Sequence, residues 1–227
     1  MGSARIPAPV RRVAAIAGAA AAGAGSPRPA KRGRPRSEEA NRAILRAATE
    51  VLAARGLGGM SIEEVASRAG VGKATIYRRW SSRGTLALDA FLTEFQGQPL
   101  PDTGTLRGDL RAALGAWVRS VTQTGAGTML VGLIAEAQQD PGLAVAWRDQ
   151  VVEPLRAQHM IMLEHAISRG EIPADIDKDV VLDLLFGAGF HRLLHGHRPL
   201  NDQFVDRVVD IVTTGILPAD RSGADPH

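Results

Sequence analysis

Apolar residues recur at intervals of three and four along most of the chain from residue 37 onward, which is the spacing of amphipathic helices. Short runs that alternate β-branched and polar residues, the pattern of strands, are few. The pattern therefore predicts an all-α fold. The expected helices cover residues 37–55 and 61–69, a short stretch from Lys73, and residues 84–96, 106–123, 128–139, 141–169, 178–195 and 202–214.

Capping residues and helix breakers mark several of these boundaries. Ser37 is expected to cap the first helix, and Ser61 with Glu64 forms a capping-box pattern at the start of the second. Pro154 lies inside the longest predicted helix, so we expect a kink near Val151 or a split into two helices.

Two of the predicted helices are short and are joined by a turn that contains glycine. Residues 69–72, Ala-Gly-Val-Gly, end one helix, and the next begins near Lys73. Ile76 and Trp80 are expected to pack back against the preceding helices, which leaves the outer face of the second helix exposed. This is the helix-turn-helix pattern, in which the second helix enters the major groove of DNA.

Charge is distributed unevenly along the chain. Residues 1–84 hold 16 basic and 5 acidic residues, whereas residues 85–227 hold 11 basic and 19 acidic ones. A basic first part and an acidic second part indicate that only the first part meets a polyanion such as double-stranded DNA.

Residues 1–36 contain no acid and are rich in alanine, glycine, proline and arginine. We expect a disordered basic arm, in which Arg34 and Arg36 lie along phosphates or in the minor groove, and in which Pro35 prevents a helix. Arg11 and the apolar run after it resemble a secretory signal, which is one alternative. The other is that translation starts downstream, so that residues 1–30 are not part of the protein.

The residue content excludes several classes of site. The chain has no cysteine, which excludes disulfides, thiolate zinc sites and cysteine nucleophiles. No run of about 20 strongly apolar residues is present, so a membrane-spanning helix is not expected. No arrangement of Ser, His and Asp and no glycine-rich phosphate loop stands out, so we do not expect an enzyme.

The histidines near residue 195 raise the question of a metal site. His191 and His195 share one helical face, and His197 follows, but zinc would need further ligands such as His159 or Glu164. Histidines near a helix end more often cap it or lie at an interface, so no metal or cofactor is expected. The aspartates at 175, 177 and 179 resemble only the start of a calcium loop, and Asp177 is better interpreted as a helix cap.

The segment 61–92 resembles the DNA-binding domain of the TetR family. The resemblance rests on Val65-Ala66, Ala69-Gly70-Val71, Thr75-Ile76-Tyr77 and the aromatic Trp80, and it extends over about residues 37–92. It implies a homodimeric, all-helical transcription regulator, usually a repressor that a small ligand releases from its operator. The pair Arg83-Gly84 departs from the common Lys-Glu, and the glycine weakens the helix start by up to ~1 kcal/mol relative to alanine.

The resemblance also implies which residues contact DNA. Ser61, Tyr77 and Arg83 are expected to contact phosphates. Lys73 and Thr75 are expected to meet base edges, and Arg78 could serve either role.

In this family the last two long helices pair across a two-fold axis, and the ligand lies inside the regulatory helices. The expected dimer residues are equally consistent with an ordinary core stripe; they are Leu184, Leu185, Gly189, Leu193, Val205, Val208, Val209 and Val212. The expected pocket is apolar and would take a hydrophobic ligand. Its candidate lining residues are Trp117, Val121, Met129, Leu133, Trp147, Met160, Phe186 and Phe190.

The sequence thus predicts a DNA-binding unit over residues 37–83, a regulatory and dimerisation unit over 84–218, and a disordered tail over 219–227. The favoured function is a cytoplasmic, ligand-released repressor that acts on a near-palindromic operator. The alternative is a regulator of the same fold without a small ligand, controlled by a protein partner or acting constitutively.

Overall fold

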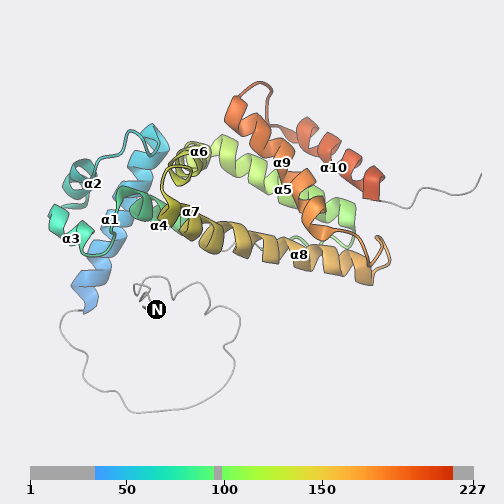
Figure 1. Ribbon diagram of the computed structural model, residues 1–227, viewed down its shortest axis with the longest axis horizontal. Coiled ribbons are helices and arrows are strands. Elements are labelled where there is room, and N and C mark those ends of the chain that lie inside the picture. The colour runs from blue at the N-terminus through green and yellow to red at the C-terminus, as the bar shows by residue number, and fades with distance from the viewer. Residues whose placement is uncertain (1–33, 95–98, 217–227) are drawn as a thin grey trace, which may run out of the picture. The chain divides into compact units, whose positions relative to one another are not determined.

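The computed structural model describes residues 34–94 and 99–216, which form helices and their connections (Figure 1). Within these residues there is no strand, and no helix is long and apolar enough to cross a membrane. The helices are α1 (Arg34–Arg55), α2 (Ile62–Ala69), α3 (Lys73–Tyr77), α4 (Arg83–Glu94), α5 (Leu106–Gln123), α6 (Ala126–Ala137), α7 (Pro141–Trp147), the π-helical turn η3 (Arg148–Val152), α8 (Glu153–Ser168), α9 (Lys178–His195) and α10 (Asp202–Ile216).

The start of α1 differs from the sequence prediction. The helix begins at Arg34, so Ser37 lies inside it, and the predictions that Ser37 is the cap and that Pro35 prevents a helix were wrong. Proline is tolerated in the first turn, because the amide that it lacks has no partner within the helix there. The described residues from Glu39 onward belong to one compact unit, and residues 34–38 belong to a separate one. Of the arm predicted for residues 1–36, residues 34–36 belong to α1, and residues 1–33 lie outside the described residues. The tail predicted for residues 219–227 also lies outside them.

Several predicted helix ends are confirmed by their hydrogen bonds. The Ser61 hydroxyl accepts a hydrogen bond of 3.2 Å from the Glu64 amide. The Glu64 carboxylate does not complete a capping box but pairs with Arg55 at 3.0 Å and Arg68 at 2.8 Å. Asp177 accepts a hydrogen bond of 3.1 Å from the amide of Val180, which is the cap predicted for α9.

The interruption expected near Val151 is also confirmed. The predicted long helix consists of α7, the π-helical turn Arg148–Val152 and α8. Pro154 is the second residue of α8, and a proline has no amide to donate to the preceding turn. The wider hydrogen-bonding ring of the π-helix lies directly before it.

The apolar core consists of two clusters. The front cluster joins α1, α2, α3 and α4 to α6 and α7, and includes Ile44, Ile76, Leu86, Leu133 and Leu143. The rear cluster joins α5, α8, α9 and α10. The side chain of Trp117 on α5 packs against both clusters. The core therefore does not divide at residue 83, because the DNA-binding helices share their cluster with helices from the second half of the chain.

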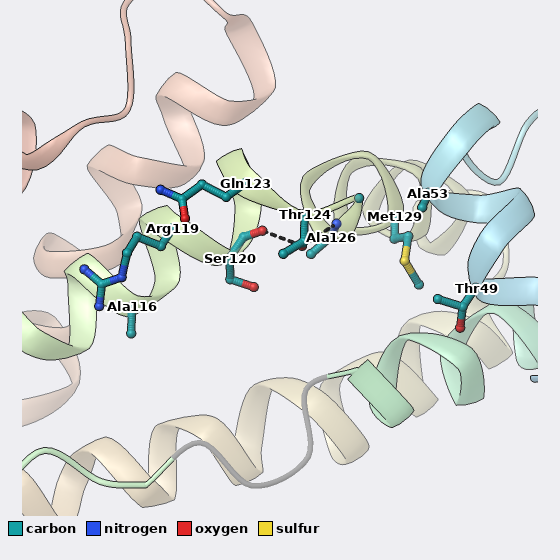
Figure 2. Close-up of a pocket in the computed structure, with 10 residues that line it drawn as sticks. Thr49, Ala53, Ala116, Arg119, Ser120, Gln123, Thr124, Ala126 and Met129 are labelled. Atoms are coloured by element: carbon teal, nitrogen blue, oxygen red, sulfur yellow. Dashed lines mark hydrogen bonds between the residues drawn. The ribbon is translucent and has the colours of Figure 1, made fainter. Parts of the chain in front are cut away.

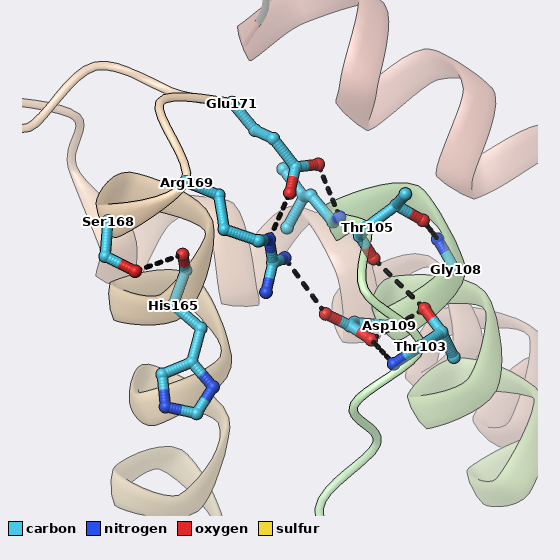
Figure 3. Close-up of polar contacts among 9 residues, drawn as sticks. Thr103, Thr105, Gly108, Asp109, His165, Ser168, Arg169 and Glu171 are labelled. Carbon is cyan, nitrogen blue, oxygen red and sulfur yellow. Dashed lines mark hydrogen bonds and ion pairs between the residues drawn. The ribbon is translucent and has the colours of Figure 1, made fainter.

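A buried network of hydrogen bonds and ion pairs connects the start of α5 with the end of α8 (Figure 3). Asp109 is 1% exposed and accepts hydrogen bonds from the Thr103 amide at 2.6 Å and hydroxyl at 2.8 Å. Arg169 pairs with Asp109 at 3.2 Å and also with Glu171, which accepts a 2.6 Å hydrogen bond from the Leu106 amide. The charge of Asp109 is therefore compensated inside the protein.

Candidate DNA-binding and regulatory sites

A small apolar core holds the second helix of the predicted helix-turn-helix. Ile76 on α3 is fully buried, and Trp80, just after α3, is 4% exposed. The indole nitrogen of Trp80 donates a hydrogen bond of 2.8 Å to Asp89 on α4. Gly70 ends α2 with φ +66°, a left-handed conformation that side chains rarely adopt. Packing on one side and this turn fix the direction in which the outer face of α3 points.

The predicted DNA-contact residues on this part of the chain are available to a partner. Lys73 and Tyr77 are each 54% exposed, Ser61 and Arg78 are exposed, and Thr75 is half-buried. Ser61 begins α2, whereas Lys73, Thr75 and Tyr77 lie on α3, which contacts α2. The side chains of Arg34 and Arg36 lie outside the described residues.

Lys73 has a partner that the sequence reasoning did not identify. Its ammonium group lies 2.7 Å from the carboxylate of Glu63 on α2. The hydrogen bond and the charge of Glu63 raise the pKa of Lys73, and Lys73 lowers the pKa of Glu63 in turn. Since the two residues are ten positions apart on different helices, only the angle of the turn brings them together.

The start of α4 is attached to helices from the second half of the chain. Arg83 lies 3.3 Å from both carboxylate oxygens of Glu136 on α6. A Cβ atom at Gly84 would lie 2.9 Å from the end of the Leu143 side chain on α7, so the glycine permits close approach there. The Arg83-Gly84 pair, which departs from the family pattern, thus has a structural role in joining α4 to α6 and α7.

Comparison with known proteins decides the family. Residues 44–90 match the model of bacterial regulatory proteins of the tetR family, and residues 100–212 match the tetracyclin repressor-like C-terminal domain. The HTH-type transcriptional regulator YdeS of Bacillus subtilis is 37% identical over 180 residues, which cover 79% of this chain and 90% of that protein. The chain belongs to the TetR family.

Two further similar proteins support the assignment of this chain to the TetR family. The DNA-binding transcriptional repressor TetR of Mycobacteroides abscessus is 36% identical over 180 residues, which cover 78% of this chain and 93% of that protein. The crystal structure of the TetR family transcription regulator SCO0332 has a TM-score of 0.67 at 39% identity and covers 79% of this chain and 100% of that one. The protein is therefore a helix-turn-helix transcriptional regulator with an all-helical fold, and it is not an enzyme.

The residues predicted to line a ligand pocket in this TetR-family protein fall into three groups. Trp117 lies 5.1 Å from Phe190 and 6.5 Å from Phe186 between ring centroids. Trp147 instead lies 5.4 Å from Phe91 on α4. The third group lies in or against the apolar clusters and consists of Val121, Met129 and Leu133 in the front cluster and Met160 against the rear one.

His159 joins the first of these groups. Its ring centroid lies 4.8 Å from that of Phe186, and burial lowers its pKa. From the sequence, this histidine was a candidate only as a metal ligand. Among the described residues, no three His, Asp or Glu side chains are placed to hold one metal ion, although the rings of His191, His195 and His197 lie near one another.

The residues predicted for the dimer interface of the TetR-family protein are divided between the surface and the core. Leu184 is 57% exposed, and Val208 and Leu193 are partly buried. A Cβ atom at Gly189 would lie 2.5 Å from the Trp117 ring, so this glycine faces the interior. Four further residues of the prediction are buried within the chain: Leu185, Val205, Val209 and Val212. Three exposed apolar side chains were not predicted: Val180 and Leu194 on α9, and Ile211 on α10.

Proposed function

We propose that this TetR-family protein is a homodimeric repressor that binds a near-palindromic operator and that a hydrophobic small molecule releases. The observation that carries the proposal is the outer face of α3, where Lys73 and Tyr77 are exposed on a helix held by the buried Ile76. Arg78, directly after this helix, is also exposed. The similarity to a protein described as a DNA-binding repressor supports repression. The protein would act in the cytoplasm, where a bacterial regulator meets its DNA.

Some of the proposed contacts position the protein on the DNA backbone, and others recognise the base sequence. Tyr77, Ser61 and Arg83 would contact phosphates, which fixes the protein on the duplex without selecting a sequence. Lys73 and Thr75 would meet base edges, and Arg78 could do either. Lys73 would have to exchange Glu63 for a guanine acceptor, and Arg83 would have to exchange Glu136 for a phosphate.

The proposed dimer interface uses the outer faces of α9 and α10. Leu184 and Leu194 are 57% and 46% exposed, and Ile211 is 73% exposed, so these large apolar side chains are open to a partner. A two-fold pairing of these faces would cover them. Leu185 and Val209, which were also predicted, would support the interface from behind. Two α3 helices would then lie about 34–36 Å apart, or a multiple of this, on the operator.

The proposed effector site lies beside Trp117, where the rings of Phe186 and Phe190 gather. A hydrophobic ligand that separates these rings would shift the helices that carry them. The attachment of Arg83 to Glu136 and of Gly84 to Leu143 offers a route from α6 and α7 to α4. The ligand would therefore favour a conformer whose two DNA-binding units no longer match the operator.

One observation favours the alternative, a regulator of this fold without a small ligand. Met129 and Leu133, predicted to line the pocket, are 1% and 0% exposed and are part of the front cluster. A filled regulatory core would suit control by a protein partner or constitutive action.

The deciding experiment is salt-dependent binding of the pure protein to the DNA just upstream of its own gene, compared with random DNA. Tight, saturable preference for the upstream fragment is expected, and it would supply the assay for effector screening. Equal, salt-sensitive binding to both fragments would place the operator elsewhere. Absence of binding at low salt would overturn the proposal.

Variants separate the proposed contact roles. Tyr77→Ala should weaken binding to all DNA about equally, and Arg83→Ala should in addition flatten the salt slope by about one unit. Lys73→Ala should change base preference, and a matched Glu63→Gln, which frees Lys73 and removes a negative charge, should strengthen binding. If Lys73→Ala weakens the affinity for specific and random DNA equally, Lys73 does not contact base edges.

A further inference from the structure

Two hollows adjoin on the side of α1 that faces α4 and α5. The first has a volume of about 340 Å³ and lies between α1, α5 and the start of α6. The second has a volume of about 360 Å³ and is lined by α1 and by Thr93 of α4. Thr49 lines both, so the two hollows meet along α1. The first hollow alone is as large as the smaller pockets that hold organic ligands in proteins.

The lining of the first hollow is part apolar and part polar (Figure 2). Figure 2 shows Ala116 and Ser120 on the α5 side, and Thr49 and the Met129 sulfur on the opposite side. Arg119 lies on the α5 side next to Ala116. An apolar ligand body would therefore have a surface to cover, with a cation beside it.

Three arginines around the two hollows have no acidic partner among the described residues. Arg42 and Arg46 line the second hollow and Arg119 the first, and all three are exposed. Among the described residues none of the three has an ion pair, whereas Arg55, Arg156 and Arg169, for example, each pair with carboxylates. Glu50, which also lines the second hollow, lies 3.8 Å from Arg68.

The start of α6 adds positive potential to the first hollow. Its N-cap residue is Gly125, which has no side chain to accept a hydrogen bond. The hydroxyl of Thr124 accepts a 3.1 Å hydrogen bond from the Ala126 amide and donates one of 2.7 Å to the Ser120 carbonyl. The positive end of the helix dipole therefore lies at the same hollow as Arg119.

We propose that the groove between α1 and the α5–α6 junction binds an amphipathic organic anion, a molecule with one acidic group joined to an apolar body. Arg119 would hold the acidic group, with Arg46 in the adjoining hollow, and the body would cover Ala116 and Ala53. The site is separate from the proposed effector cluster at Trp117 and differs from it in charge. A ligand here would bridge α1, which carries the DNA-binding unit, and α5.

The test is a calorimetric titration of the full chain with decanoate, compared with decanol, its neutral counterpart. Decanoate should bind saturably and at least about tenfold more tightly than decanol. Arg119→Gln should weaken decanoate binding about tenfold or more and leave decanol binding unchanged. Ala116→Phe, which fills the hollow, should abolish binding. Arg198→Gln, an exposed arginine remote in sequence from both hollows, is the matched control and should leave decanoate binding unchanged.

Three results would overturn the proposal: no decanoate binding up to about 1 mM, equal affinity for decanoate and decanol, or equal effects of Arg119→Gln and Arg198→Gln. If Ala116→Phe does not fold, as judged by circular dichroism, the Arg119 comparison still decides. Binding is measured without DNA. A failure of the operator experiment and a failure of this one are therefore distinguishable.

Discussion

The front and rear clusters both have ion pairs between helices, and they differ in how closely the backbones approach. In the front cluster, glycines bring helices into close contact: a Cβ atom at Gly125 would lie 2.7 Å from the Ala53 Cα on α1, and one at Gly132 would lie 3.0 Å from the Leu57 amide nitrogen. In the rear cluster, ion pairs connect the helices, as between Arg111 on α5 and Asp206 on α10 at 2.5 Å.

This difference indicates how each region responds to change. Close backbone contact leaves little room to adjust, so we expect a displacement of α6 to shift the end of α1. Exposed ion pairs between long side chains tolerate small shifts and contribute little each. The front cluster is therefore suited to transmit movement to the DNA-binding helices, and the rear cluster to serve as a scaffold.

The largest effect on the free energy of unfolding is expected in the rear cluster, where a buried carboxylate takes part in an ion pair. Arg169→Ala should lower the free energy of unfolding by about 3 kcal/mol, because it leaves Asp109 buried without its cation. Urea denaturation provides the measurement. The control is Arg148→Ala, which breaks an exposed pair with Asp149 and should cost less than about 1 kcal/mol. Equal losses in the two variants would contradict the role given to the network.

The second-largest effect on the free energy of unfolding is expected in the front cluster. Gly125→Ala should lower the free energy of unfolding by about 2 kcal/mol, because the new methyl group overlaps the backbone of Ala53. Gly58→Ala is a matched control, since a Cβ atom there has no neighbour within 4 Å. A Gly125 variant as stable as the Gly58 variant would show that α1 and α6 have room to separate.

A smaller effect is expected at Gly84. The new methyl group would meet only the flexible end of Leu143, and alanine favours the helix by up to about 1 kcal/mol, so the two contributions oppose each other. Gly84→Ala should therefore change the unfolding free energy by less than about 1 kcal/mol. A loss as large as that of Gly125→Ala would mean that Leu143 cannot move and that α4 is held as rigidly as α1.

The smallest effect is a pH dependence in the front cluster. Burial raises the pKa of Asp89, and the hydrogen bond from Trp80 only partly opposes this. A carboxyl whose pKa is higher in the folded state contributes stability at low pH, and that stability is lost as the pH rises through the folded pKa. Asp89→Asn, which keeps an acceptor for Trp80, should therefore raise the melting temperature at neutral pH.

The advantage of Asp89→Asn should shrink as the pH falls to about 4, near the ordinary carboxyl value. Melting curves across this range check the sign. An advantage that persists unchanged in acid would show that the titration of Asp89 is not its cause.

Local patterns along the chain were enough to predict the helices and the helix-turn-helix. These patterns depend on residues only a few positions apart, so they are visible without knowledge of the fold. They are the helical periodicity, the caps at Ser61 and Asp177, and the break at Pro154. The start of α1 was the exception, because Pro35 was interpreted as a breaker although a first turn accepts it.

Which distant side chains contact one another depends on how the helices pack. Glu136 lies 53 positions from Arg83, and Asp109 lies 60 positions from Arg169, so no local pattern indicates either pair. The sequence also does not indicate which of two adjacent leucines is buried: Leu185 is fully buried, whereas Leu184 is 57% exposed. Both lie on the apolar stripe of α9, and the packing of the other helices against α9 selects which one faces the core.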